Sequence, residues 1–225
     1  MEIEAKFVLD DPDIFQQLKT SQTLAGYTIS TGKIKNVHDY YFDTSERLIL
    51  QAGYACRIRD DGKKIKFTLK GLNKGKGIIH RREELEIELP DKLWSDKTWS
   101  VKACFDMSNK DLSLNDLPAG EIRDSFLQIT HGDDLHLLFG LTQKRFVRII
   151  TDADRVVAEF SLDDVHVSVD GHEQTYFEVE IEQMSAGNET DLIELAKSLE
   201  HDWQLSPILN SKFERGLAFW DENKQ

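Results

Sequence analysis

Polar and apolar side chains alternate strictly from the first residues of the chain. Glu2, Glu4 and Lys6 are separated by apolar residues. Successive side chains of a β-strand point to opposite faces, so residues 1–7 are predicted to form a strand with two carboxylates and one ammonium on one face. A solvated surface strand would explain one such stretch. The same alternation, however, returns along the chain.

Four later stretches repeat this alternation and are predicted as strands, at 54–60, 64–70, 82–89 and 175–182. Five predicted strands therefore have one face made almost wholly of charged groups of both signs. The charged residues of the four later faces are Arg57 and Arg59, then Lys64, Lys66 and Lys70, then Arg82, Glu84, Glu86 and Glu88, and finally Glu178, Glu180 and Glu182.

The other elements are predicted from local signals. Further strands are predicted at 37–44, 143–149, 156–163 and 165–169. Helices are predicted to begin at Asp11, Asn188 and Ser211, which are residue types that cap the N-terminus of a helix. From 91 to about 139 the apolar residues recur at spacings closer to helical, which predicts a helix-rich insertion packed on the sheet. No linker or low-complexity tract interrupts residues 1–225, so we expect a single domain.

Like charges that are adjacent on one strand face repel each other, so they persist most readily where something neutralises them. Mg²⁺ or Mn²⁺ would neutralise Glu-x-Glu, and a polyanion would neutralise Arg-x-Arg. A closed barrel turns such faces toward each other and has no edge strands. One interpretation is therefore a charged lumen that holds a metal–polyphosphate complex, and the other is an amphipathic sheet with one wet face.

Composition narrows the range of functions. The 225 residues carry a formal net charge of −13, which argues against a general nucleic-acid binder. An excess of carboxylates suits hard divalent cations. We expect no disulfide framework from Cys56 and Cys104. Neither a signal peptide nor an apolar run of membrane length is evident, so a cytoplasmic protein without a membrane partner is expected.

The charged motifs together resemble those of the CYTH superfamily, the triphosphate tunnel metalloenzymes, from residue 2 to about 217. A lone Glu-x-Glu-x-Lys would be weak evidence, but the ordered set is specific. The matching motifs are Glu2-x-Glu4-x-Lys6, Tyr41-Phe42-Asp43-Thr44, Arg57-x-Arg59, Thr68-Leu69-Lys70, Arg82-x-Glu84-x-Glu86, Phe160-Ser161-Leu162-Asp163, Glu178-x-Glu180 and Ser211-Lys212-Phe213. Two positions depart from the family pattern: Gln143 stands where Lys is frequent, and Phe213 where Tyr is frequent.

The resemblance implies an α+β fold, an eight-stranded antiparallel barrel with helices on its outside. It also implies a triphosphate substrate and Mg²⁺ or Mn²⁺ as cofactor, with Asp163 orienting a neighbouring arginine. The implied metal ligands are Glu2, Glu4, Glu178 and Glu180. The implied catalytic residues are Glu4, Lys6, Glu84 and Glu86. The implied phosphate-binding residues are Lys6, Arg57, Arg59, Lys66, Lys70, Arg82, Arg145 and Lys212.

Three functions are compatible with these residues. The first is metal-dependent hydrolysis of a triphosphate, with tripolyphosphate, thiamine triphosphate and ATP as candidate substrates. The second is an adenylyl cyclase of the class IV type. The third is a non-catalytic polyphosphate-binding module, although simple anion binding needs no metal-binding carboxylates. The preferred metal, the general base and the oligomeric state, a homodimer included, stay open.

Overall fold

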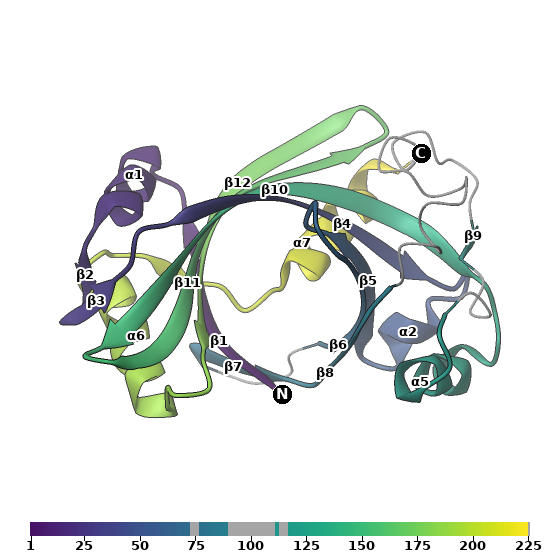
Figure 1. Cartoon of the computed structure of the whole chain (residues 1–225). Helices are drawn as coiled ribbons and strands as arrows, with labels where there is room; N and C mark the ends of the chain where they lie inside the picture. The colour runs from purple at the N-terminus through teal and green to yellow at the C-terminus, as the bar shows by residue number, and fades with distance from the viewer. Residues whose placement is uncertain (73–76, 90–110, 113–116, 225) are drawn as a thin grey trace.

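The strands form one antiparallel sheet that curves into a nearly closed barrel in this computed structural model (Figure 1). The structure describes residues 1–72, 77–89, 111–112 and 117–224. Hydrogen-bonded neighbours around the barrel follow the order β1 (Glu2–Leu9), β12 (His172–Gln183), β11 (Arg155–Val169), β10 (Leu135–Asp152), β4 (Lys33–Asp43), β5 (Tyr54–Asp60), β6 (Ile65–Gly71) and β8 (Glu84–Glu88).

The barrel closes through a broken strand. The predicted strand 82–89 is divided at Glu83 into β7 (Ile79–Arg82) and β8, and the backbone oxygen of Glu83 accepts a bond of 2.8 Å from the Gly71 amide. The two halves differ in partner, because β7 pairs with β1 whereas β8 pairs with β6. The described barrel therefore has nine strands where eight were expected.

Two other predicted boundaries are wrong. The segments 156–163 and 165–169 are one strand, β11, because β12 pairs with it without a break from Ala158 to Val169. The segment 143–149 is the middle of β10, which begins at Leu135 because it pairs there with β4 and the short β9 (Asp111–Leu112). Residues 135–139 are thus strand, although their apolar spacing suggested helix.

The described part of the expected helix-rich insertion contains one helix, α5 (Glu121–Thr130). Ile122 and Phe126 of this helix are buried, whereas Leu127 is exposed. Residues 90–110 and 113–116, which include Trp94, Trp99 and Cys104, lie outside the described residues.

The apolar strand faces point outward, and helices cover them (Figure 1). The helices α1 (Pro12–Thr20) and α6 (Glu189–His201) pack with β1, β11 and β12 around one core, which includes Phe7, Leu18, Phe160 and Leu195. The helices α2 (Leu48–Gln51) and α5 pack over β5 and β6 around a second core. The charged faces of the strands therefore point toward the inside of the barrel.

The helix starts agree with the predicted caps. The Asp11 carboxylate accepts a bond of 2.8 Å from the Asp13 amide, and Asn188 and Ser211 each form a capping box with the third residue of their helix. The remaining short strands are β2 (Thr23–Leu24), β3 (Tyr27–Ile29) and β13 (Ser206–Pro207). None of the helices in the described ranges has the length and apolar character needed to cross a bilayer.

The last helix, α7 (Lys212–Asn223), packs on β10 and β11. The Phe213 ring lies 5.2 Å from that of Tyr41, centre to centre, in a third apolar cluster with Phe139. A side chain at Gly216 would collide with the Phe139 ring, at 2.3 Å, so glycine permits this close approach. As a result, the first residue of α7, Lys212, borders the inside of the barrel.

Candidate functional site

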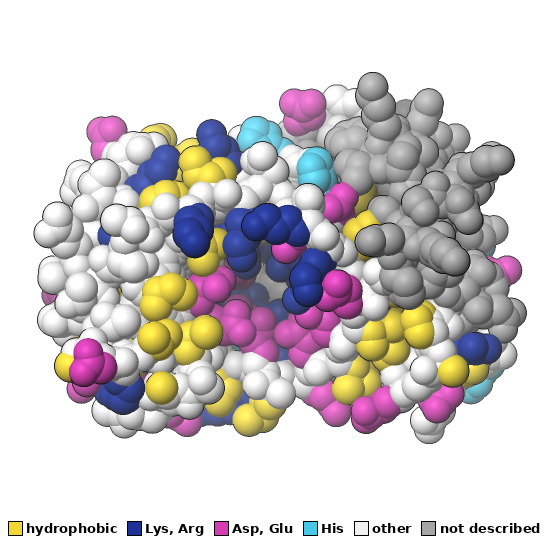
Figure 2. All heavy atoms as spheres, in the orientation of Figure 1, with side chains coloured by type: hydrophobic (Ala, Val, Ile, Leu, Met, Phe, Trp, Pro, Cys, Tyr) yellow, Lys and Arg dark blue, Asp and Glu magenta, His cyan; other side chains and the backbone are white. Residues whose placement is uncertain are grey.

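The inner faces of the strands enclose a cavity of about 480 Å³. In Figure 2, Lys and Arg side chains gather along the upper and right edge of an opening, and Asp and Glu side chains along its left and lower edge. Nine basic residues line the cavity, namely Lys6, Lys35, Arg57, Arg59, Lys66, Lys70, Arg82, Arg145 and Lys212. Eight acidic residues also line it, namely Glu2, Glu4, Asp61, Glu84, Glu86, Glu159, Glu180 and Glu182. The cavity therefore holds more cations than anions in a protein whose net charge is −13.

All the residues predicted for the site line this cavity except Glu178. The Glu178 side chain is fully buried beside α7, where its carboxylate accepts a bond of 2.7 Å from Lys212 Nζ and lies 3.4 Å from Arg215 Nη1. Burial raises the pKa of Glu178, against the attraction of Lys212. Glu178 thus lies behind Lys212 and does not reach the cavity.

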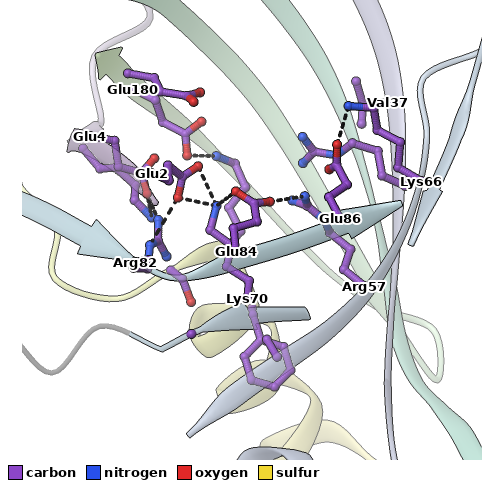
Figure 3. Close-up of a pocket in the computed structure, with 18 of the residues that line it drawn as sticks. Glu2, Glu4, Val37, Arg57, Lys66, Lys70, Arg82, Glu84, Glu86 and Glu180 are labelled. Atoms are coloured by element: carbon purple, nitrogen blue, oxygen red, sulfur yellow. Dashed lines mark hydrogen bonds and ion pairs between the residues drawn. The ribbon is translucent and has the colours of Figure 1, made fainter. Parts of the chain in front are cut away.

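One wall of the cavity is built by β1 and β7 (Figure 3). Glu4 lies between Lys6, at 3.3 Å, and Arg82, with which it forms a close ion pair. Glu2 Oε1 accepts a bond of 2.7 Å from Lys70 Nζ, which also lies 2.6 Å from Oε2. Burial acts to raise the pKa of Glu2, but Lys70 and Arg82 lower it below its usual value. Burial also lowers the pKa of Lys6.

Adjacent to this wall, the acidic residues of β8 face the basic residues of β5 and β6 (Figure 3). Glu84 lies 3.6 Å from Arg57 and 3.8 Å from Lys70. Glu86 accepts a bond of 2.6 Å from Lys66 Nζ. A continuous series of ion pairs therefore follows the cavity wall from β1 to β6, with carboxylates and cations alternating.

Two buried aspartates next to the cavity each bind one of the arginines that line it. Asp39 is fully buried and binds Arg59 through two bonds of 2.7 Å. Its Oδ2 also accepts a bond of 2.6 Å from Gln143. Burial acts to raise the pKa of Asp39, but Arg59 and Arg57 lower it to about 2. Bidentate binding fixes the plane of a guanidinium, so Asp39 sets the orientation of Arg59.

Asp163 does the same on the other side of β10. It is fully buried and binds Arg145 through bonds of 2.7 and 2.6 Å, which confirms that it orients a neighbouring arginine. Lys212 Nζ lies 3.0 Å from Asp163 and 2.7 Å from Glu180. Burial acts to raise the pKa of Glu180, but Lys212 and Arg145 hold it well below its usual value. Glu180 is therefore a charged carboxylate at neutral pH.

The carboxylates suit a divalent cation in chemistry but are not arranged as a finished metal site. Within the described residues, no three acidic, His or Cys side chains converge in a way that could hold a metal ion. The donor oxygens are nevertheless present, because Glu2 Oε2 and Glu4 Oε1 are buried at the cavity, where they form ion pairs with Lys70 and Arg82. Mg²⁺ and Mn²⁺ prefer such oxygens. Binding would require the basic neighbours to release these carboxylates.

Sequence reasoning missed several cavity residues. Lys35, Tyr41 and Glu159 line the cavity, and Asp39 supports it from below, but none of them was predicted as a site residue. The alternation that revealed the other strands is also present in β4, where Lys35, Asp39 and Tyr41 share one face. Val37 lies between them on that face, and it hides the charged pattern.

Comparisons with known proteins agree with this architecture. A solved structure from Hippeastrum, proposed as an adenylyl cyclase and described as having a dominant triphosphatase activity, has a TM-score of 0.67 at 21% identity, over 100% of this chain and 97% of that one. A protein from Bacillus halodurans, proposed as an adenylate cyclase, has a TM-score of 0.57 at 20% identity, over 96% of each chain. No curated protein matches the chain in sequence. Residues 1–217 match the CYTH domain, and the chain therefore belongs to the CYTH family.

Proposed function

We propose that this protein hydrolyses a triphosphate inside the barrel with the help of Mg²⁺ or Mn²⁺. The observation that carries the proposal is the composition of one cavity, in which nine basic and eight acidic side chains face each other. A simple anion-binding site would need only the basic residues. The triphosphatase activity described for the Hippeastrum protein, which has the same fold, is in line with this proposal.

The basic residues would act by neutralising the phosphate charge. Phosphoryl transfer depends mainly on positioning and on stabilising charge at the phosphate oxygens. Arg59 and Arg145 enter the reaction already oriented, because Asp39 and Asp163 hold their guanidinium groups. These two arginines therefore need little reorganisation when the substrate binds.

The acidic residues Glu2, Glu4 and Glu180 are the candidate ligands of the metal. When bound, the metal would polarise phosphate oxygens and lower the pKa of the attacking water. Lys70 and Arg82 are bound to Glu2 and Glu4 in this structure. A triphosphate that attracts these two cations would free the two carboxylates for the metal. Substrate and metal are therefore expected to strengthen each other's binding.

The test is one assay with two products measured. The protein is incubated with Mg²⁺ or Mn²⁺ and, separately, tripolyphosphate, thiamine triphosphate and ATP, and both orthophosphate and cyclic AMP are quantified. Orthophosphate release from any of these substrates supports the proposal. Cyclic AMP with pyrophosphate from ATP would contradict it in favour of a cyclase. Tight tripolyphosphate binding without turnover would contradict it in favour of a binding module.

Arg57→Ala should mainly weaken substrate binding. Arg57 lines the cavity and is less strongly held than Arg59, because its shortest carboxylate distance is 3.6 Å. Loss of a desolvated charge-assisted contact costs roughly 2–4 kcal/mol. KM for the best substrate should rise accordingly in steady-state assays. Arg81→Ala is the matched control, since Arg81 pairs with Glu189 on the outside, and an equal effect of both variants would contradict a role of Arg57 in binding.

A further inference from the structure

Lys35 differs from every other basic residue of the cavity. Within the described residues, each of the other eight has a carboxylate oxygen within 4.0 Å, whereas Lys35 has none. Its side chain lines the cavity and is exposed to solvent. Among the described residues, Lys35 is therefore the cation of the cavity without an ion pair.

The neighbours of Lys35 increase the need for an anion. The register of β4 and β10 places Lys35 directly opposite Arg145. Like charges in directly opposite positions of an antiparallel pair repel each other. Arg145 is neutralised by Asp163 and Glu180, but these carboxylates do not contact Lys35. The pair of cations thus favours a bound anion on the Lys35 side.

Asp61 is near Lys35 but is already engaged. Its Oδ1 accepts bonds of 3.0 and 2.9 Å from the Lys63 and Lys64 amides in the turn between β5 and β6. Partial burial acts to raise the pKa of Asp61, but these amides, together with Lys35 and Lys66, lower it. Asp61 therefore supports the turn and does not form an ion pair with Lys35.

We propose that Lys35 binds one end phosphate of an inorganic triphosphate, at the position that the esterified α-phosphate of a nucleoside triphosphate would occupy, and so makes the site selective for inorganic over nucleoside triphosphates. This inference rests on the proposed function. A terminal phosphate can carry about two negative charges at neutral pH, whereas a phosphate esterified to a nucleoside carries one on the same atoms. At that position an ammonium without an ion pair therefore favours the free phosphate of the inorganic compound over the esterified one.

The described part of the cavity offers no surface for a nucleobase beside Lys35. Its aromatic lining residues are Tyr41 and Phe213, which are 4% and 3% exposed and pack against each other. They belong to the apolar cluster under α7. Arg145 and Asp61, which lie near Lys35, are charged, and the adjacent Val37 is only 2% exposed, which suits a phosphate.

The test compares Lys35→Ala and Lys33→Ala with the wild type on tripolyphosphate and ATP. Lys33 is the matched control, because it is an exposed lysine two residues earlier on the same strand and does not line the cavity. For Lys35→Ala we expect KM for tripolyphosphate to rise about tenfold with kcat within about twofold. KM for ATP should rise less than about threefold. Lys33→Ala should stay within about twofold of the wild type on both.

Two results would overturn the assignment of Lys35. One is an unchanged KM for tripolyphosphate in Lys35→Ala, and the other is an equal loss on tripolyphosphate and ATP. If the wild type hydrolyses neither compound, Lys35 is tested by calorimetric binding of tripolyphosphate. The proposed function itself fails only if thiamine triphosphate is not hydrolysed either. Binding about tenfold weaker in Lys35→Ala would support its role, and equal binding would reject it.

Discussion

Glu4→Gln is expected to reduce triphosphate hydrolysis by at least about 100-fold, an effect typical of removing one preorganised electrostatic contact in an active site. Glu4 is 3% exposed and lies between Lys6 and Arg82. An amide keeps the shape of the side chain but removes the negative charge, so it can neither bind a divalent cation well nor balance these two cations. Steady-state rates at saturating Mg²⁺ and Mn²⁺ measure the effect.

Glu88→Gln is the matched control for this variant. Glu88 lies on β8 and forms an exposed ion pair of 2.6 Å with Lys64, but it does not line the cavity. Its activity should equal that of the wild type, because exposed ion pairs contribute little. Thermal unfolding of both variants checks that Glu4→Gln is folded. A folded Glu4→Gln protein that kept most of its activity at saturating metal would contradict the assignment of Glu4 as a metal ligand.

The alternation of charged and apolar residues predicts the barrel because it is a local property of each strand. It assigned Glu4, Arg57 and Glu180 to inward faces correctly, since side-chain direction follows from the period of two alone. The division at Glu83 is not predicted by the alternation. Glu83 is charged although its face is apolar at Leu85 and Ile87, but this irregularity does not reveal that the pairing partner changes from β1 to β6 there.

Depth along the barrel axis is also beyond a local pattern. Glu178 and Glu180 are equivalent in the sequence motif, yet only Glu180 lines the cavity, because α7 and Lys212 cover Glu178. Position relative to α7 depends on packing between segments far apart in the chain. The ion pairs of Asp39 likewise depend on β5 and β10 lying on either side of β4. The sequence predicts which face of the strand a residue occupies, and tertiary packing determines which side chains it contacts there.

Asp39→Asn is expected to cause the largest loss of stability among these substitutions. Asp39 is fully buried and shared by Arg59, Arg57 and Gln143. Removing one partner of a buried ion pair typically costs about 3–5 kcal/mol, because the remaining charge is left without compensation. Urea unfolding at pH 7 measures the free energy of unfolding. Asp221→Asn is the control, since it breaks only the surface ion pair with Arg47 and should cost less than about 1 kcal/mol.

The pH dependence separates the charge of Asp39 from its shape. Its pKa of about 2 lies below the 3.8 of an ordinary aspartate, so its ionised form stabilises the fold above pH 3.8, and this stabilisation is lost as the pH falls toward 2. The difference corresponds to about 2 kcal/mol. The stability gap between the wild type and Asp39→Asn should therefore be constant from pH 7 to pH 5 and narrow below pH 4. The Asp39→Asn variant carries no charge at this position, so only the wild type can lose this stabilisation at low pH. A stability gap that stays constant down to pH 3 would therefore mean that Asp39 acts through its shape and hydrogen bonds.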